Sequence, residues 1–147
     1  MALSDLYPIP DIDPVWSVPQ EFEAAFDWRY DDGRSRMMHL YQKGKDMQWD
    51  ALERIDWGLE FDTENPMEIP DELLGLYHTP FWAKMSGAEK ANARRHLQAW
   101  TMSQFMQGEQ AAMICAAKIV QQVPDLDAKF YASTQVMDEA RHVDAYK

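Results

Sequence analysis

The stretch Asp138-Glu139-Ala140-Arg141-His142 decides how the rest of this sequence is interpreted. Glu139 and His142 are three positions apart, so on a helix they project from the same face. Glu109 lies in an earlier helical pattern, and the break Val123-Pro124-Asp125 separates the two patterns. Both glutamates are fourteen residues from the break, roughly 21 Å at the rise of an α-helix. The sequence therefore predicts a helical hairpin in which Glu109 is level with Glu139 and His142.

The residues around these side chains indicate that they point into the hairpin. Glu109 shares its predicted face with Phe105, Ala112 and Ala116. A carboxylate in an apolar stripe is costly unless it is paired, protonated or bound to a metal ion. One Glu on one helix and a Glu-x-x-His on the next form half of a di-iron carboxylate site in a four-helix bundle. Glu-x-x-His also occurs on exposed helices that bind no metal, but the matching depth and the apolar flanks favour a metal site.

The segment from about Leu97 to Lys147 resembles the first metal-binding helix pair of ferritin-like di-iron carboxylate oxygenases. Its Asp-Glu-x-Arg-His string is most similar to hydroxylase subunits of bacterial multicomponent monooxygenases and to related di-iron N-oxygenases. The resemblance implies an all-α, ferritin-like helical bundle, of which this chain holds the first metal-binding pair and an N-terminal helical extension. The family carries a second Glu and a second Glu-x-x-His downstream, whereas this sequence stops five residues after His142.

The resemblance also assigns roles to individual residues. Glu109 would be a terminal metal ligand, Glu139 a bridging carboxylate and His142 an imidazole ligand. Asp138 would accept a hydrogen bond from the histidine of the opposite helix pair, and Arg141 would hold the carboxylate network. The implied cofactor is a pair of iron ions, and manganese suits the same ligands.

Three functions are compatible with these residues. The first is a non-haem di-iron oxidoreductase that activates O2 to oxidise an organic substrate. The second is a ferritin-like iron-oxidising or iron-binding protein completed by dimerisation, and the third is a non-catalytic helical scaffold. The bulky N-terminal residues 1–85 favour the first over the second. The second ligand set would come from a homodimer, from a partner chain or from a continuation of the chain, which we expect to be truncated after residue 147.

Two regions are predicted, an N-terminal arm and helical extension over residues 1–85 and the metal-binding hairpin over residues 86–147. Ser86 and Glu89 have the spacing of a capping box and should start the long helix. Pro124 should end this helix and Asp125 should cap the next one. The predicted buried side of the long helix consists of Leu97, Trp100, Thr101, Gln104, Phe105, Gly108, Ala112, Cys115 and Ile119.

The N-terminal region gives weaker signals. Prolines at positions 8, 10, 14 and 19 predict an extended arm over residues 1–20. A helix is expected from near Pro19 through Phe26, and a second from Arg34 to about Trp57. A loop should follow over Asp62–Pro70, with at most a short helix over Asp71–Leu76. The methionines and tryptophans of this region are interpreted as core, rather than as a cofactor pocket.

Composition limits the kinds of partner. The net charge of −11 argues against nucleic acid or an anionic membrane surface, since both attract basic proteins. The single Cys115 excludes an internal disulfide and suggests a reducing compartment, where it should be a small buried residue. The start of the sequence has no signal-peptide pattern, and no stretch approaches the ~20 apolar residues of a membrane helix. We therefore expect a cytoplasmic protein.

Overall fold

The computed structural model describes residues 21, 23–26 and 30–147, in which every regular element is a helix. The predicted arm over residues 1–20 lies outside these residues. The α-helices are α2 (Ser35–Asp46), α3 (Ala51–Arg54), α4 (Gly87–Gln122) and α5 (Leu126–Tyr146), and three 3-10 turns, η1 (Asp71–Leu73), η2 (Gly75–His78) and η3 (Trp82–Lys84), precede α4. The all-α class is confirmed. No described helix is long and apolar enough to cross a membrane.

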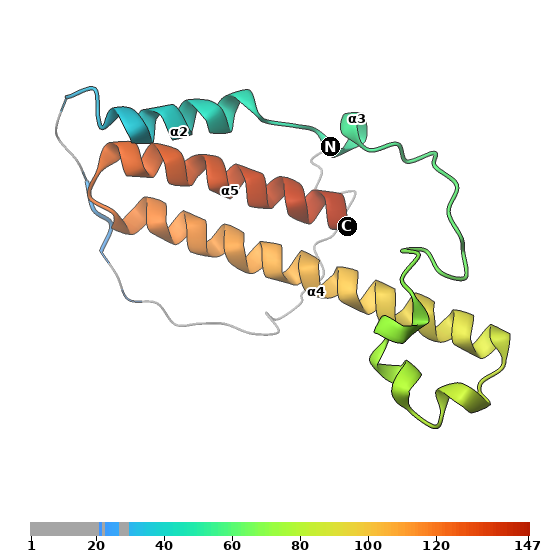
Figure 1. The fold of residues 1–147 in the computed structure, drawn as a ribbon. Coiled ribbons are helices and arrows are strands. Elements are labelled where there is room, and N and C mark those ends of the chain that lie inside the picture. The colour runs from blue at the N-terminus through green and yellow to red at the C-terminus, as the bar shows by residue number, and fades with distance from the viewer. Residues whose placement is uncertain (1–20, 22, 27–29) are drawn as a thin grey trace, which may run out of the picture.

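The three longest helices lie side by side, with α5 between α2 and α4 (Figure 1). Helix α4 begins with the predicted capping box: the Ser86 hydroxyl accepts from the Glu89 amide at 3.3 Å, and the Glu89 carboxylate accepts from the Ser86 amide at 2.7 Å. Helix α4 ends at Gln122, and Pro124 follows its C-cap residue Val123. Asp125 occupies the N-cap position of α5 as predicted, but its side chain makes no capping hydrogen bond.

The first half of α4 extends beyond α5 and carries the loop and 3-10 turns that precede it (Figure 1). Arg94 donates two hydrogen bonds to the Asp71 carboxylate, at 2.6 and 2.7 Å, and thereby fixes η1 to α4. Buried Gln98 donates to Asn65 at 2.7 Å and accepts from the amide of Met67 at 3.0 Å. The predicted loop over Asp62–Pro70 and the short helical turn after it are confirmed.

The predicted buried face of α4 is wrong. Most of its residues are exposed: Leu97, Trp100, Gln104, Phe105, Gly108, Cys115 and Ile119. Ala116 is buried instead, and Met102, Met106 and Met113 are half-buried. Apolar residues occur around most of α4, so its pattern does not select one face. The position of α5 determines which face of α4 is buried.

Two helix boundaries in the N-terminal region also differ from the prediction. Residues 21 and 23–26 have no regular secondary structure, so the helix expected from Pro19 through Phe26 is absent where the structure describes it. The helix expected over Arg34–Trp57 is interrupted after Asp46. Asp50 begins the short α3 by accepting a hydrogen bond from the Leu52 amide at 2.8 Å, and this local cap competes with a continuous helix.

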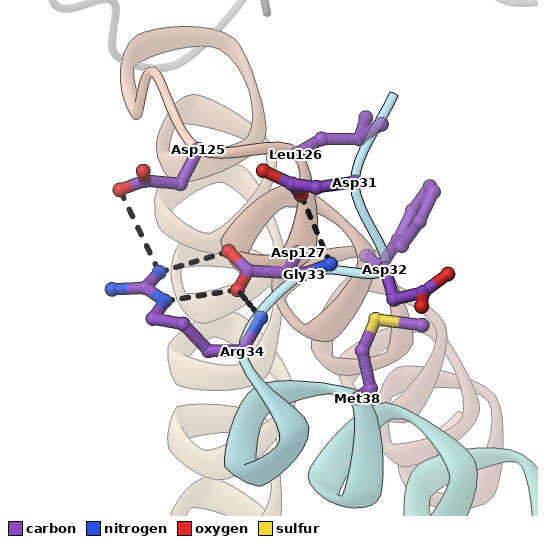
Figure 2. A pocket seen from close by; sticks show the side chains of 9 residues that line it. Asp31, Asp32, Gly33, Arg34, Met38, Asp125, Leu126 and Asp127 are labelled. Atoms are coloured by element: carbon purple, nitrogen blue, oxygen red, sulfur yellow. Dashed lines mark hydrogen bonds and ion pairs between the residues drawn. The ribbon is translucent and has the colours of Figure 1, made fainter. Parts of the chain in front are cut away.

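Helix α2 is fixed to the start of α5 by Arg34. Its guanidinium donates to the two oxygens of the Asp127 carboxylate at 2.8 and 2.9 Å, and its backbone amide donates at 2.7 Å. Figure 2 shows this guanidinium between the carboxylates of Asp127 and Asp125, the latter 3.6 Å away. The hydrogen bonds from the Arg34 side chain, followed by that from its amide, hold the pKa of the buried Asp127 far below its usual range.

This contact predicts an acid-sensitive contribution to stability. A carboxylate whose pKa is lowered by folding stabilises the protein above its unfolded-state pKa of about 3.9, and the contribution is lost as the pH falls towards the lower folded-state value. Asp127→Asn should therefore be less stable than the wild type at pH 7, and the difference should shrink below about pH 4. Urea unfolding at a series of pH values measures both effects. Asp32→Asn, which changes an exposed carboxylate two residues before Arg34, is the control. A pH-independent difference for Asp127→Asn would contradict the prediction.

Helices α2 and α5 approach closely at Gly44. A Cβ atom placed on Gly44 would lie 2.7 Å from the Thr134 hydroxyl oxygen and 2.9 Å from its Cβ. Gly44 weakens helix α2 by its flexibility, but it allows this contact. The absence of a side chain at this position therefore sets how near α2 lies to α5.

A pair of glycine substitutions tests this interpretation. Gly44→Ala should lower the free energy of unfolding by about 1–2 kcal/mol, because overpacking outweighs the gain in helix propensity. Gly108→Ala is the matched control, since a Cβ there would meet no atom within 4 Å, and it should raise stability by up to ~1 kcal/mol. Chemical unfolding measures both changes. Equal stabilisation by the two substitutions would show that the α2–α5 contact is not tight.

Candidate metal centre

Three side chains of the α4–α5 hairpin form a cluster. Glu109 of α4 and Glu139 and His142 of α5 each offer one ligand atom, and these atoms lie within 4.8 Å of one another. The His142 Nδ1 atom is 3.3 Å from Glu109 Oε2 and 3.1 Å from Glu139 Oε2. The hairpin geometry expected from the sequence therefore brings together the three predicted residues.

One nitrogen of His142 faces two carboxylates in this cluster. Nδ1 of a histidine carries at most one proton, whereas two carboxylates face it here. A single N–H cannot donate a full hydrogen bond to both oxygens at once. A cation at this point would instead attract both carboxylates and accept the lone pair of a neutral imidazole.

Burial and charge act together on Glu139. Its side chain is 22% exposed, that of Glu109 26% and that of His142 38%. The pKa of Glu139 is raised, first by burial and then by the neighbouring Glu109, while His142 opposes the shift. The two carboxylates thus disfavour each other's negative charge, which a bound cation would offset. Two carboxylate oxygens and an imidazole nitrogen are a donor set that Fe(II) and Mn(II) accept.

Asp138 and Arg141 form a pair beside the cluster. The Arg141 guanidinium donates to Asp138 and, at 3.0 Å, to the backbone oxygen of Trp49. The resemblance implies that Arg141 holds the carboxylate network, and among the described residues the carboxylate that it binds is that of Asp138. Nε of Arg141 is buried and has no hydrogen-bond partner among the described residues. This leaves one buried donor beside the cluster.

Trp49 supports the cluster and was missed as a site residue in the sequence. The Arg141 guanidinium lies 5.2 Å from the centre of its ring, and the ring of His142 lies 6.3 Å from it at an angle of 35°. Trp49 reaches this position because the chain turns between α2 and α3. Asp50, a good helix-capping residue directly after Trp49, was the available signal for that turn.

A pocket of about 460 Å³ opens beside the cluster. Glu139 and His142 lie on its wall with the Asp138–Arg141 pair, while the end of α2, Trp49 and Arg54 form the opposite side. The sequence predicts that the methionines and tryptophans of the N-terminal region form core, yet Met47 and Trp49 line this pocket. The other described histidines, His39, His78 and His96, lie outside the metal-ligand cluster.

A comparison with protein families identifies a match that covers most of the chain. The family model described as p-aminobenzoate N-oxygenase AurF matches residues 31–144. The match spans α2 to α5 and includes the cluster, the Asp138–Arg141 pair and Trp49. No curated protein and no solved structure gives a significant match.

Proposed function

Because the chain belongs to the p-aminobenzoate N-oxygenase family of ferritin-like di-iron oxygenases, we propose that Glu109, Glu139 and His142 are iron ligands and that the reaction is N-oxygenation of an aromatic amine. Family membership makes the protein a non-haem di-iron oxidoreductase that uses O2 and acts on an organic substrate. Its cofactor is a pair of iron ions. The observation that supports the ligand assignment is the convergence of three donor atoms within 4.8 Å.

The residues of the hairpin have distinct tasks in this proposal. Glu109 and Glu139 bind iron through their carboxylates, and His142 binds through Nδ1, the nitrogen nearest to both of them. Trp49 restricts the position of the His142 ring, and Arg141 fixes Asp138 beside it. When bound, the di-iron centre supplies the electrons for O2 activation, while the protein positions the ligands and shapes the site.

Three protein ligands cannot fill the coordination spheres of two iron ions. We therefore include in the proposal a second Glu and Glu-x-x-His set, from a second copy, a partner chain or further residues of the same protein. The partial exposure of the three ligand side chains supports this, since a closed metal site would bury them. The exposed apolar residues Leu97, Phe105 and Ile119 on α4 offer surface against which more helices can pack.

Substrate-dependent O2 uptake tests the function. The protein in its complete assembly is loaded with Fe(II) under anaerobic conditions, then given a two-electron reductant, O2 and p-aminobenzoate as the probe. We expect amine-dependent O2 consumption and a hydroxylamine or more oxidised nitrogen product, identified by mass spectrometry with 18O2. O2 consumption that follows iron alone, with no change to the amine, would contradict the proposal and favour an iron-oxidising protein. Loading with Mn(II) in parallel tests which metal supports the reaction.

A further inference from the structure

The pocket beside the cluster has the size and position of a small-molecule site. Its volume of about 460 Å³ lies within the range of roughly 300–1,000 Å³ typical of such sites. Glu139 and His142 lie on its wall, so a molecule bound there is next to the proposed iron ligands. Trp49 adds an aromatic surface, and Leu40 and Met47 add apolar ones.

Three cationic side chains line this pocket, and two of them make no ion pair with a residue that the structure describes. Arg141 is paired with Asp138 and bonded to the Trp49 backbone. For Lys43 and Arg54, in contrast, no ion pair occurs within the described part of the chain. Arg54 lies over the Trp49 ring, with its guanidinium carbon 5.9 Å from the ring centre, which holds its charge beside the aromatic wall.

The positive charge of Lys43 and Arg54 contrasts with the negative charge of the rest of the chain. The whole chain has a net charge of −11, so its surface as a whole repels organic anions. Of the acidic groups on the pocket wall, Asp138 is paired with Arg141, and Glu139 belongs to the cluster that a metal ion would neutralise. Lys43 and Arg54 therefore provide positive charge on the side of the pocket opposite α5.

We propose that Lys43 and Arg54 determine specificity by binding the anionic group of the organic substrate, while its apolar part lies against Trp49. The identity of this ligand as the substrate rests on the proposed function, but its binding does not require iron. Nothing in the family description or in the metal cluster assigns a role to these two residues. They come from α2 and α3, outside the hairpin that carries the metal ligands.

A matched pair of probes separates charge from shape. 4-Fluorobenzoate and 4-fluorobenzamide have nearly the same size, and only the first is an anion. We titrate each into the full protein, with and without Fe(II), and follow binding by 19F NMR. The benzoate should bind at least about tenfold more tightly than the benzamide, and its affinity should fall with increasing salt. Equal affinity for the two probes would overturn the inference.

Substitutions then locate the anion. Lys43→Gln and Arg54→Gln should each weaken benzoate binding by about three- to fivefold, and the double variant by about tenfold or more, because both side chains are exposed. Lys45→Gln is the matched control: Lys45 lies over the Tyr41 ring, outside the pocket, and its loss should leave the affinity unchanged. Benzoate affinity that is unaffected in the double variant would also overturn the inference. Thermal unfolding confirms that each variant is folded.

Iron binding, measured on the same samples, distinguishes this inference from the proposed function. If the benzoate binds selectively through Lys43 and Arg54 and no iron pair forms in the complete assembly, the di-iron function is wrong and anion recognition stands. If an iron pair forms and the two probes bind equally, the inference is wrong and the di-iron function stands.

Discussion

His142→Ala should abolish formation of the iron pair in the complete assembly. The variant removes the only nitrogen donor of the cluster and leaves Glu109 and Glu139 facing each other without an intervening group. Loss of an outer-shell partner typically costs 10–100-fold in metal affinity, so loss of a ligand should weaken iron binding by more than about 100-fold. Glu109→Ala and Glu139→Ala should have effects of similar size.

Anaerobic Fe(II) titration measures this affinity, and Mössbauer spectroscopy after exposure to O2 shows whether two irons are coupled. His39→Ala and His96→Ala are matched controls, because both histidines are exposed and lie outside the cluster. If His142→Ala binds iron like the wild type, or if the wild type holds only isolated single irons, the ligand assignment is wrong. The α4–α5 hairpin would then be better explained as a scaffold.

Arg141→Leu should have the second largest effect, on both stability and metal binding. Its side chain is 15% exposed and joins Asp138 of α5 to the backbone of Trp49, which lies between α2 and α3. Removing it leaves Asp138 without this partner and removes the hydrogen bond from α5 to the Trp49 backbone. Since Asp138 is partly exposed, we expect a loss of about 2–3 kcal/mol in the free energy of unfolding, below the usual cost of breaking a fully buried pair.

The same variant should also weaken iron binding, since the ring of Trp49 restricts the His142 side chain. Arg141→Lys should give an intermediate result, because an ammonium group lacks the planar fork that reaches two acceptors at once. Arg95→Leu is the control, since Arg95 is exposed and its hydrogen bond to the Thr63 carbonyl is long, at 3.3 Å. Its loss should change the free energy of unfolding by less than about 0.5 kcal/mol. Urea unfolding and Fe(II) titration would refute the prediction if Arg141→Leu matched Arg95→Leu in both.

The ligand cluster could be predicted because it depends on local rules that sequence carries directly. Helical rise is constant, so equal distances from Pro124 place Glu109 level with Glu139. The i, i+3 spacing places His142 on the same face as Glu139. Ser86 and Glu89 define the start of α4 through hydrogen bonds within four residues. These features need no knowledge of what packs against the hairpin.

The wrong predictions concern features of the structure that depend on tertiary contacts. Apolar residues such as Leu97 and Ile119 compete with Met106 and Met113 for the buried face of α4, and only the position of α5 decides between them. The role of Trp49 depends on a break between α2 and α3, followed by contact with residues more than ninety positions later. Hydrophobic periodicity describes one helix at a time, so it does not contain this information.

The sequence separation of these contacts also implies an order in which the molecule assembles. Glu109 and His142 are 33 residues apart, whereas Arg34 reaches Asp127 over 93 residues and Trp49 reaches Arg141 over 92. The longer closures cost roughly 1 kcal/mol more in chain entropy, and the hairpin has many local contacts to offset its own. We therefore expect α4 and α5 to pair first and α2 to dock last. A native chain that transiently releases α2 would lose one wall of the pocket while Glu109, Glu139 and His142 remained together, so small molecules could exchange without disassembly of the metal ligands.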